Sequence, residues 1–283
     1  MKINTNVSSL TAQESASNTN KAITSSLEKL SSGLKVNKAA DDASGLAIAD
    51  KLRTQATSIN QGISNGNSAV ALLQIADKSM AEQSNILDTV KAKLIQANTA
   101  TTSADGRESI RKDIDKLLNQ LDNIAKQTNY NGTYLLQADA TSGTAGASTA
   151  HVFQIGEKTT DTITMNTVQA NTTGLGLTTL AGLSASGLTT AIAAAQQTVV
   201  DTAITTLNGY RGDIGSTQNQ VESAIRNLTT QATNIKNAES TIRDVDYAAE
   251  SANYNKLNII AQAGSYAISQ ANSTQQNVLR LLQ

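Results

Sequence analysis

The sequence contains no Cys, no Pro and no Trp, and it has one His and one Phe in 283 residues. Without Cys, the chain forms no disulfide and offers no thiolate chemistry. Without Pro, it lacks the commonest interrupter of helices, which permits long uninterrupted helices. So few aromatic residues argue against a thick globular core, because aromatic side chains normally supply much of a core's buried area. These absences favour an elongated helical bundle.

Charge and hydropathy exclude several classes of partner. The formal net charge is -1, so the chain has no basic excess that would attract nucleic acid or acidic lipid. No stretch approaches the roughly 20 apolar residues needed to span a bilayer. The first ten residues lack the basic and then apolar pattern of a cleaved secretory signal. We therefore expect no nucleic-acid or membrane partner, and a cytoplasmic location or an export route without a cleaved signal.

Both ends of the chain carry an apolar stripe at helical spacing. The N-terminal stripe contains Ile23, Leu27, Leu30 and Leu34. The C-terminal stripe alternates steps of three and four, through Tyr254, Leu257, Ala261, Gly264, Ile268, Ala271, Gln275, Val278 and Leu282. Such a stripe needs another helix to cover it. Periodicity alone leaves two interpretations open: the terminal helices pair with each other, or other copies of the chain cover them.

Two longer heptad patterns lie between these ends. The first contains Ile59, Ile63, Gly66, Val70, Leu73, Asp77, Met80, Ser84, Leu87, Lys91 and Leu94. Its polar positions, Asp77 and Lys91, predict a partly wet partner surface. The second contains Leu207, Arg211, Ile214, Gln218, Val221, Ile225, Leu228, Ala232, Ile235 and Ile242. Each pattern predicts a long helix.

The middle of the chain has weaker signals. Residues 99–106 predict a helix break with Ser103 and Asp105 as caps, and a helix with apolar positions from Ile110 to Ile124 follows. Thr-rich alternation predicts short strands at 133–136, 152–155 and 162–168. The predicted fold class is mainly α: an elongated antiparallel helical bundle or coiled coil with a small β-hairpin region, in which the N- and C-terminal helices pair.

Several long motifs resemble those of bacterial flagellins. They are SSGLKVNKAADDASGLAIADKLR at 31–53, INTNVSSL at 3–10, TNYNGTYLL at 128–136, STIRDVDYAAE at 240–250 and QQNVLRLLQ at 275–283. The matches are ordered and lie at the expected ends of the chain. With its short middle, the chain resembles a short form similar to flagellins of the Campylobacter and Helicobacter group.

The resemblance implies a structural subunit, secreted through the flagellar type III apparatus, that polymerises into the extracellular filament for swimming motility. Residues 1–42 with 243–283 would form an inner coiled-coil tube. Residues 43–170 with 190–242 would form a rod domain with a small β region, and residues 171–189 a short variable outer loop. The implied partners are other copies of the chain, the flagellar cap and hook-junction proteins, and an export chaperone at the C-terminal helix.

In this interpretation the polymerisation stripe consists of terminal apolar residues, namely Ile23, Leu27, Leu30, Leu34, Leu257, Ile268, Val278 and Leu282. Two alternatives are a hook-filament junction protein, which has similar ends, and an exported helical effector or adhesin that stays monomeric.

Catalytic interpretations find little support. The single His151 excludes a His-pair metal site, and its surroundings predict the start of a strand and an ordinary surface or edge histidine. Asp41 and Asp42 are better explained as carboxylates at a helix start, where they accept bonds from free N–H groups. We therefore predict no catalytic residue, no cofactor and no metal site.

One segment concerns immune recognition. Many flagellins bind a Toll-like receptor through a helix resembling QRVRELAVQ, and residues 88–96 of this chain read DTVKAKLIQ at the matching place. Thr89 replaces a basic residue and Lys93 replaces a leucine; Asp113 belongs to the same altered region. The loss of an anchor guanidinium and a charge in an apolar contact each weaken a binding hot spot. We therefore predict weak receptor binding.

Overall fold

The computed structural model describes residues 5–141 and 143–281, with side chains described as far as residue 277. The chain divides into two compact units. The terminal unit comprises Met1–Ala56 and Thr233–Gln283, and the central unit comprises Thr57–Ala232. Two long helices contribute residues to both units.

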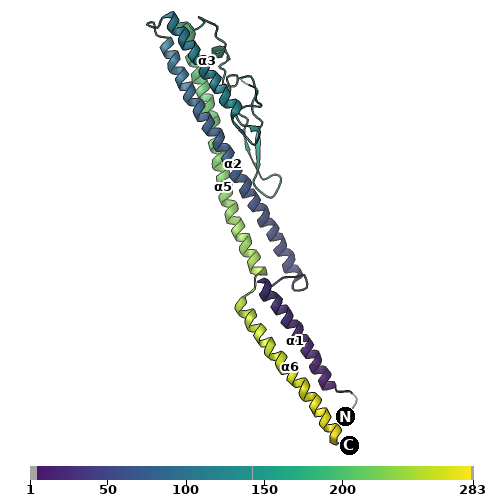
Figure 1. Cartoon of the computed structure of the whole chain (residues 1–283). Helices are drawn as coiled ribbons and strands as arrows, with labels where there is room; N and C mark the ends of the chain where they lie inside the picture. Colours follow the sequence, from purple (N-terminus) through teal and green to yellow (C-terminus); the bar gives the residue numbers. More distant parts are fainter. Residues whose placement is uncertain (1–4, 142, 282–283) are drawn as a thin grey trace. The chain divides into compact units, whose positions relative to one another are not determined.

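The chain is mainly helical, as predicted, with two small antiparallel strand pairs (Figure 1). The elements in chain order are α1 (Val7–Ser32), α2 (Ala43–Ala97), α3 (Ala104–Gln127), β1 (Asn129–Tyr130), β2 (Thr133–Tyr134), β3 (His151–Gln154), β4 (Thr162–Met165), α4 (Thr178–Ala181), α5 (Thr190–Arg243) and α6 (Tyr247–Leu281). The predicted pairing of the terminal helices is confirmed, because α1 packs along α6.

Three helix boundaries lie where the sequence predicts them. Gly33 ends α1 in a left-handed conformation with φ 74°, which glycine adopts without a steric penalty. The Asp42 carboxylate accepts from the N–H groups of Ser44 and Gly45 at 3.0 and 2.9 Å, which confirms its capping role at the start of α2. Ser103 caps α3 by accepting from the Gly106 N–H at 3.1 Å. Local side chains therefore decide these boundaries.

The central unit has a closed hydrophobic core. Its largest fully buried side chains include Leu73, Met80, Leu87 and Leu94, which are apolar members of the predicted α2 stripe. Leu118 and Leu121 of α3 and Leu207 and Ile214 of α5 belong to the same cluster. Because α3 and the strand pairs lie over the layer formed by α2 and α5, side chains between these elements have neighbours on every side (Figure 1).

The two charged positions of the α2 stripe face opposite charges on α5. Asp77 accepts from Arg211 Nε at 2.9 Å, and Lys91 forms an ion pair with Asp201. The partner residue moves backward along α5 as the position advances along α2, so the two helices are antiparallel. The predicted partly wet surface is therefore the contact with α5 of the same chain.

Two hairpins follow α3. In the first, Tyr130 pairs with Thr133, which leaves Asn131 and Gly132 as a two-residue turn. Both turn residues have positive φ, 50° and 81°, as the tight hairpin turn requires. In the second hairpin, His151 pairs with Met165, and the β3–β4 ladder runs to Gln154 and Thr162.

His151 differs from the predicted surface or edge histidine. It begins β3, as expected, but its side chain is buried and its Nε2 has no hydrogen-bond partner in the described part of the chain. Burial lowers the pKa of His151, and a hydrogen bond to the Tyr134 main chain opposes this shift. The imidazole therefore belongs to the packing of the hairpins.

The segment 171–189, expected as a loop, packs against α3. It contains the short helix α4, which the sequence pattern did not indicate, and Leu177, Leu180 and Leu188 are buried. Arg111 of α3 donates to the Leu183 carbonyl oxygen at 3.2 Å, and the Glu108 carboxylate accepts from the Ser186 N–H at 3.0 Å. Segment 171–189 is therefore held to α3 by hydrogen bonds as well as by apolar packing.

The Glu108 carboxylate is stabilised in its charged form at this contact. It accepts two bonds from the Arg111 guanidinium, at 2.9 and 2.8 Å, in addition to the bond from the Ser186 N–H. The Arg111 bonds first, and then the Ser186 bond, lower the pKa of Glu108 to about 2. Glu108 therefore contributes to both contacts with segment 171–189. It accepts from the Ser186 main chain, and it also holds the Arg111 guanidinium that donates to the Leu183 carbonyl oxygen.

A buried carboxylate joins the same segment to the C-terminal part of α3. Asp122 accepts from the Thr172 N–H at 2.8 Å and from the Thr172 hydroxyl at 2.9 Å. Burial raises the pKa of Asp122 and outweighs these hydrogen bonds, which favour the charged form. The two bonds satisfy the carboxylate in a setting where an unpaired charge would be costly.

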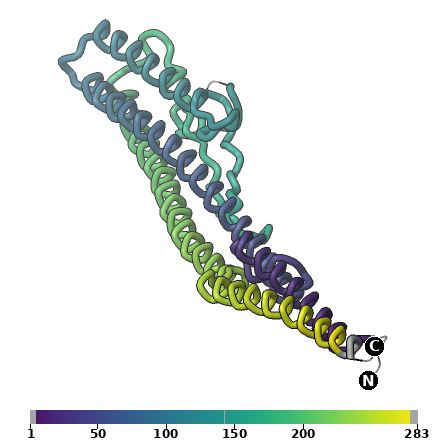
Figure 2. Tube along the Cα trace, turned by 60° about the horizontal axis from the view of Figure 1, so that its bottom comes forward, coloured from purple at the N-terminus to yellow at the C-terminus, as the bar shows by residue number. Residues whose placement is uncertain are grey.

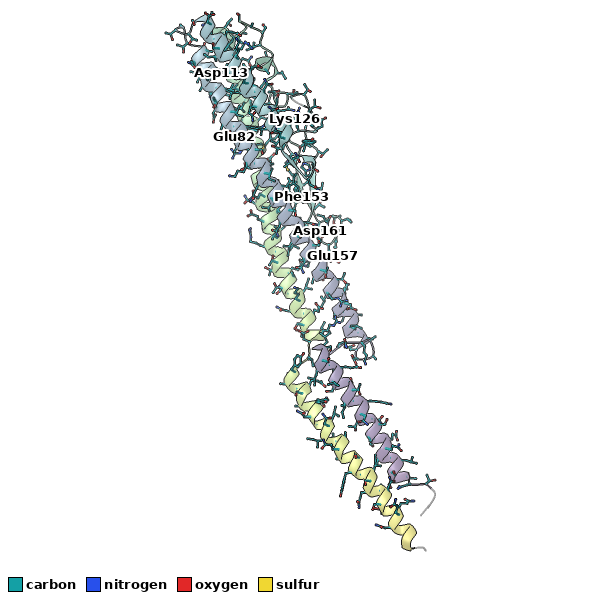
Figure 3. The ribbon with its side chains drawn as sticks, viewed as in Figure 1. Glu82, Asp113, Lys126, Phe153, Glu157 and Asp161 are labelled. Atoms are coloured by element: carbon teal, nitrogen blue, oxygen red, sulfur yellow. The ribbon has the colours of Figure 1, made fainter. Side chains whose placement is uncertain are left out.

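Hairpin β3–β4 rests on a notch in α2, where Figure 3 labels Phe153, Glu157 and Asp161 beside this helix. A Cβ added to Gly62 would lie 1.9 Å from the Ile155 carbonyl oxygen, and one added to Gly66 would lie 2.8 Å from Ile225 of α5. Between them, Asn65 Nδ2 donates to the Gln154 carbonyl oxygen at 3.0 Å. The notch therefore accepts the hairpin only while residue 62 has no side chain.

We predict opposite effects for two Gly→Ala substitutions in helices. Gly62→Ala should destabilise the chain by about 1 to 3 kcal/mol because the new methyl group displaces main chain. Gly209→Ala, in α5, should stabilise it by about 0.5 to 1 kcal/mol, because nothing lies within 4 Å of the added Cβ. Urea unfolding of the monomer followed by circular dichroism measures both. Equal changes in the two variants would contradict the close approach of the hairpin.

Candidate assembly surface

Helices α1 and α6 form an antiparallel pair in the terminal unit, with the start of α1 beside the end of α6 (Figure 2). Asn6 Nδ2 donates to the Ala271 carbonyl oxygen at 3.1 Å, while Ser26 of the last turns of α1 donates to Glu250 in the first turn of α6. These two contacts determine the antiparallel register.

The contact between the two helices is called the terminal seam. Its α6 side consists of half-buried positions at steps of three and four, namely Tyr254, Leu257, Ala261, Gly264, Ile268, Ala271 and Gln275. Its α1 side has the same spacing and consists of Ser9, Ala12, Ala16, Thr19, Ile23, Ser26 and Leu30. Many of these residues are small, and a Cβ at Gly264 would lie 3.8 Å from Ala16 Cβ. The helices therefore approach closely but enclose little apolar volume.

The terminal seam leaves most of its side chains partly open. Ser26 is the one residue of α1 that is buried, and no side chain described in α6 is buried. The Ser26 hydroxyl donates to the Glu250 carboxylate, and this bond lowers the pKa of Glu250. Two helices alone have no third layer to cover the flanks of the contact.

At the other end of the pair, the residues that follow α1 form hydrogen bonds with the residues that precede α6. Leu34 forms an isolated β-bridge with Asp244, and the Val245 N–H donates to the Gly33 carbonyl oxygen at 3.0 Å. A Cβ at Gly33 would lie 2.9 Å from the Tyr247 hydroxyl. Leu34 is therefore half buried at the place where α1 and α6 are held together.

The structure places the predicted polymerisation stripe in several settings. Ile23, Leu30, Leu257 and Ile268 lie in the terminal seam. Leu27 lies outside it and is 51% exposed. Leu282 lies outside the described residues, as does the side chain of Val278. Only part of the stripe is therefore covered within one chain, and that part incompletely.

Leu27 lines an open groove of about 370 Å³ beside the C-terminal half of α1. Its other lining residues are Thr24, Glu28, Ser31, Ser32 and Asn37. Lys38 and Glu28 form an exposed ion pair at 2.6 Å on this surface. The groove combines one apolar side chain with a polar rim.

Further apolar residues on the terminal unit are open to solvent. Ile259 and Tyr266 of α6 are 67% and 74% exposed, and they lie seven residues apart on the side of the helix away from the terminal seam. Eight of the twelve exposed large hydrophobic side chains in the described part of the chain belong to this unit: Val7, Leu10, Leu27, Ile48, Tyr247, Ile259, Ile260 and Tyr266. Sequence reasoning did not single out this outer face of α6, although the seven-residue spacing was a signal for it.

The altered receptor-contact segment lies in the central unit. Lys93 of α2 pairs with Asp113 of α3 at 3.0 Å, and Figure 3 labels Asp113. The Thr89 hydroxyl donates to the Asn85 carbonyl oxygen at 2.9 Å within α2. Both changed residues therefore satisfy their polar groups within the chain.

The described residues contain no group of three or more His, Cys, Asp or Glu side chains that could hold a metal ion. Within the same ranges, no helix has both the length and the apolar character needed to cross a membrane.

Two family models match the chain. The bacterial flagellin N-terminal helical region matches residues 3–141, and the bacterial flagellin C-terminal helical region matches residues 197–282. The chain belongs to the bacterial flagellin family. The two matched regions contain the α1 and α6 helices of the terminal seam.

Curated flagellar filament proteins match this chain, two along its whole length and one along part of it. The flagellin of Bacillus subtilis (strain 168) is 36% identical over 303 residues, covering 100% of both chains. The flagellar filament 33 kDa core protein of Treponema phagedenis is 32% identical over 285 residues, also covering 100% of both. Flagellin B of Helicobacter pylori (strain J99) is 44% identical over 162 residues, which are 57% of this chain and 30% of that protein.

Solved structures agree with this assignment. The crystal structure of Bacillus cereus flagellin is similar with a TM-score of 0.50 and 30% identity, covering 62% of this chain and 94% of that one. A putative flagellar hook-associated protein from Vibrio parahaemolyticus has a TM-score of 0.60 at 12% identity, which shows a shared fold alone. This flagellin is therefore a structural subunit of the extracellular flagellar filament, and it self-polymerises.

We predict that Ser26→Ala weakens the terminal seam at neutral pH but not in acid. The pKa of Glu250 is lowered in the folded chain, chiefly by the Ser26 hydroxyl. Its stabilising contribution is therefore present above the unfolded pKa of Glu250 and is lost as the pH falls through the folded pKa. The α1 amides of the variant should exchange hydrogen faster than those of the wild type at neutral pH, and the two sets of rates should converge in acid. The matched control is the exposed Ser17→Ala; if the Ser26 variant kept the wild-type pH profile, the pairing would not contribute.

Proposed function

We propose that residues 1–42 and 243–283 form the filament core, and that polymerisation is driven by covering the terminal seam and its exposed flanks. One observation supports this most directly: the apolar side chains described in α1 and α6 remain half buried or exposed in the single chain. Covering them by neighbouring copies gains roughly 25 cal/mol for each Å² of apolar surface removed from water.

The polymerisation stripe includes Ile23, Leu27, Leu30, Leu34, Leu257, Ile268, Val278 and Leu282. Within this proposal the stripe has two roles. The seam residues hold α1 to α6 in each subunit, while Leu27 and its groove receive a side chain of another copy. A contact between different surfaces of successive copies does not close on itself and therefore propagates as a helix.

We further propose that residues 43–170 with 190–242 form the outer rod. Residues 171–189 form its outer segment, which the Glu108 and Arg111 contacts hold against α3. We propose no enzymatic activity, cofactor or metal for this chain.

The other partners follow from the same open helices. Before assembly, the exposed Ile259, Ile260 and Tyr266 leave α6 with an apolar surface in the free subunit. An export chaperone at the C-terminal helix would shield this surface, and the cap and hook-junction proteins would cover it at the two ends of the filament. A solvated apolar face of this kind is a typical interaction site.

We propose weak recognition by the Toll-like receptor that binds many flagellins. The Lys93 ammonium pairs with Asp113. It stands where the QRVRELAVQ segment of receptor-binding flagellins has a leucine that makes an apolar contact. A receptor that packs an apolar surface there must remove Lys93 from water, which is costly for a charge. Thr89 also provides no guanidinium to bind an acidic or polar group of the receptor.

We predict that Leu27→Ser raises the critical concentration for polymerisation roughly fivefold, because about half of a leucine side chain, about 1 kcal/mol, no longer gains from burial. Its monomer helicity should be unchanged, since Leu27 lies outside the terminal seam. Ile23→Ser should lower both polymerisation and monomer helicity. Sedimentation of filaments over a concentration series, with circular dichroism of the monomer, measures both effects. Lys21→Ser is the matched exposed control; a Leu27→Ser chain with the critical concentration of this control would refute the role of the groove.

We predict that Thr89→Arg combined with Lys93→Leu increases receptor activation in reporter cells. The first substitution restores the basic side chain, and the second the leucine, of the QRVRELAVQ segment of receptor-binding flagellins. The double change costs little stability, because the Lys93–Asp113 pair is surface-exposed and such pairs contribute about 0 to 1 kcal/mol. Asp113→Asn alone is the control for the loss of that pair. A double variant with unchanged potency would show that other residues prevent recognition.

A further inference from the structure

The chain contains three Asn-Gly pairs, Asn65–Gly66, Asn131–Gly132 and Asn208–Gly209. In such a pair the main-chain nitrogen of Gly can attack the side-chain carbonyl carbon of Asn, because Gly has no Cβ to hinder the approach. The attack requires rotation of the main chain between the two residues. The three pairs differ in how freely the fold permits this rotation.

The pair in α2 is held most tightly. Asn65 Nδ2 donates to the Gln154 carbonyl oxygen at 3.0 Å, and Asn65 Oδ1 accepts from Gln61 at 2.9 Å. Gly66 packs so closely that an added Cβ would lie 2.8 Å from Ile225. Both the side-chain amide and the main chain of this pair are therefore fixed.

The pair in α5 is held by its helix alone. Asn208 and Gly209 are exposed, and nothing lies within 4 Å of a Cβ added to Gly209. The helical hydrogen bonds still restrain the main chain, and the attack requires local opening in the interior of a long helix. This pair is accessible but conformationally locked.

Asn131 and Gly132 are neither packed nor helical. They form the exposed turn between β1 and β2, and nothing lies within 4 Å of a Cβ added to Gly132. Among the described residues, none forms a hydrogen bond with the Asn131 side-chain amide. The ladder that closes the turn is two residues long on each strand, with one further main-chain bond from the Leu135 N–H to the Thr128 carbonyl oxygen at 3.2 Å. A hairpin this short is only marginally stable by itself.

We propose that Asn131 is the site of spontaneous deamidation in this chain, with solvent water as the co-reactant. Base removes the proton from the Gly132 nitrogen, which then bonds to Asn131 Cγ; the Cγ–Nδ2 bond breaks and Nδ2 leaves as ammonia after taking a proton from water. Water then opens the resulting five-membered imide. Hydrolysis at Cγ leaves an aspartate joined to Gly132 through the normal main chain, whereas hydrolysis at the main-chain carbonyl carbon gives isoaspartate.

Either product changes the turn. Both introduce a carboxylate, and isoaspartate also adds one carbon to the main chain. The present turn fits two residues of positive φ to the strand pair, so the longer path does not match the Tyr130–Thr133 register. Conversion to isoaspartate therefore unpairs β1 and β2 just before the buried Leu135 and Leu136.

The test is to incubate the purified full-length protein in mildly alkaline buffer at body temperature and follow all three pairs by peptide mass spectrometry. An isoaspartate O-methyltransferase assay with S-adenosylmethionine detects the isoaspartate product. Asn131 should convert at least about tenfold faster than Asn208, because opening the helix costs more than about 1.4 kcal/mol, the free energy of a tenfold ratio. Asn65 should convert most slowly. Conversion of Asn208 or Asn65 at the rate of Asn131 overturns the proposal.

Two variants provide matched controls. Asn131→Ser should remove most of the isoaspartate signal, whereas Asn208→Ser should leave its yield unchanged. A large loss of signal in Asn208→Ser overturns the assignment even if Asn131→Ser alters the fold of the hairpin. Circular dichroism of both variants verifies that the helices remain.

Discussion

Two packed helices leave their large apolar side chains partly open to water, and this geometric constraint separates the two units of the chain. In the central unit, α3 and the hairpins form a further layer over α2 and α5, and Leu73, Met80 and Leu87 are fully buried. In the terminal unit, α1 and α6 have no such cover, and Ile23 and Leu257 remain half buried at equivalent heptad spacing. The number of layers, rather than the pattern itself, determines how much apolar surface leaves water.

This difference suits a subunit that completes its folding in two stages. The central unit has its own core and can reach its native packing in the single chain. Under the proposed assembly, the terminal helices gain their remaining stability from contacts with neighbouring copies, so their stability depends on subunit concentration. In the proposed assembly, polymerisation is favoured because it completes a core that each chain leaves half formed.

Polar and small residues determine how the helices align. Two helices with heptad stripes of similar apolar side chains can slip past each other by one repeat at little cost in free energy. A specific polar pair between the helices opposes this slip, because the slip would break the pair. The Asp77–Arg211 and Lys91–Asp201 pairs set the position of α5 along α2, and Ser26 with Glu250 does the same for α1 and α6. Gly62 adds a steric condition, because it admits the hairpin carbonyl where any larger residue would not.

Much of the local structure follows from residues that act on their own neighbours. Gly33 and Asp42 mark the break between α1 and α2, and Asn131 with Gly132 marks a tight turn, because capping and positive φ depend on a few adjacent atoms. The α2 stripe and its wet positions were likewise predictable, since each residue's face follows from helical geometry. The family motifs were readable because each is a continuous run of residues.

The sequence by itself thus determined several helix boundaries, which faces of the long helices are apolar, and the family. Only the tertiary structure decided that Ile23 and Leu30 lie in the terminal seam while Leu27 stays open, because small residues such as Ala16 and Gly264 set the line of closest approach. It also decided that segment 171–189 packs on α3 and that His151 is buried. Periodicity reports the faces of one helix, whereas burial depends on which distant segments cover them and how closely they approach.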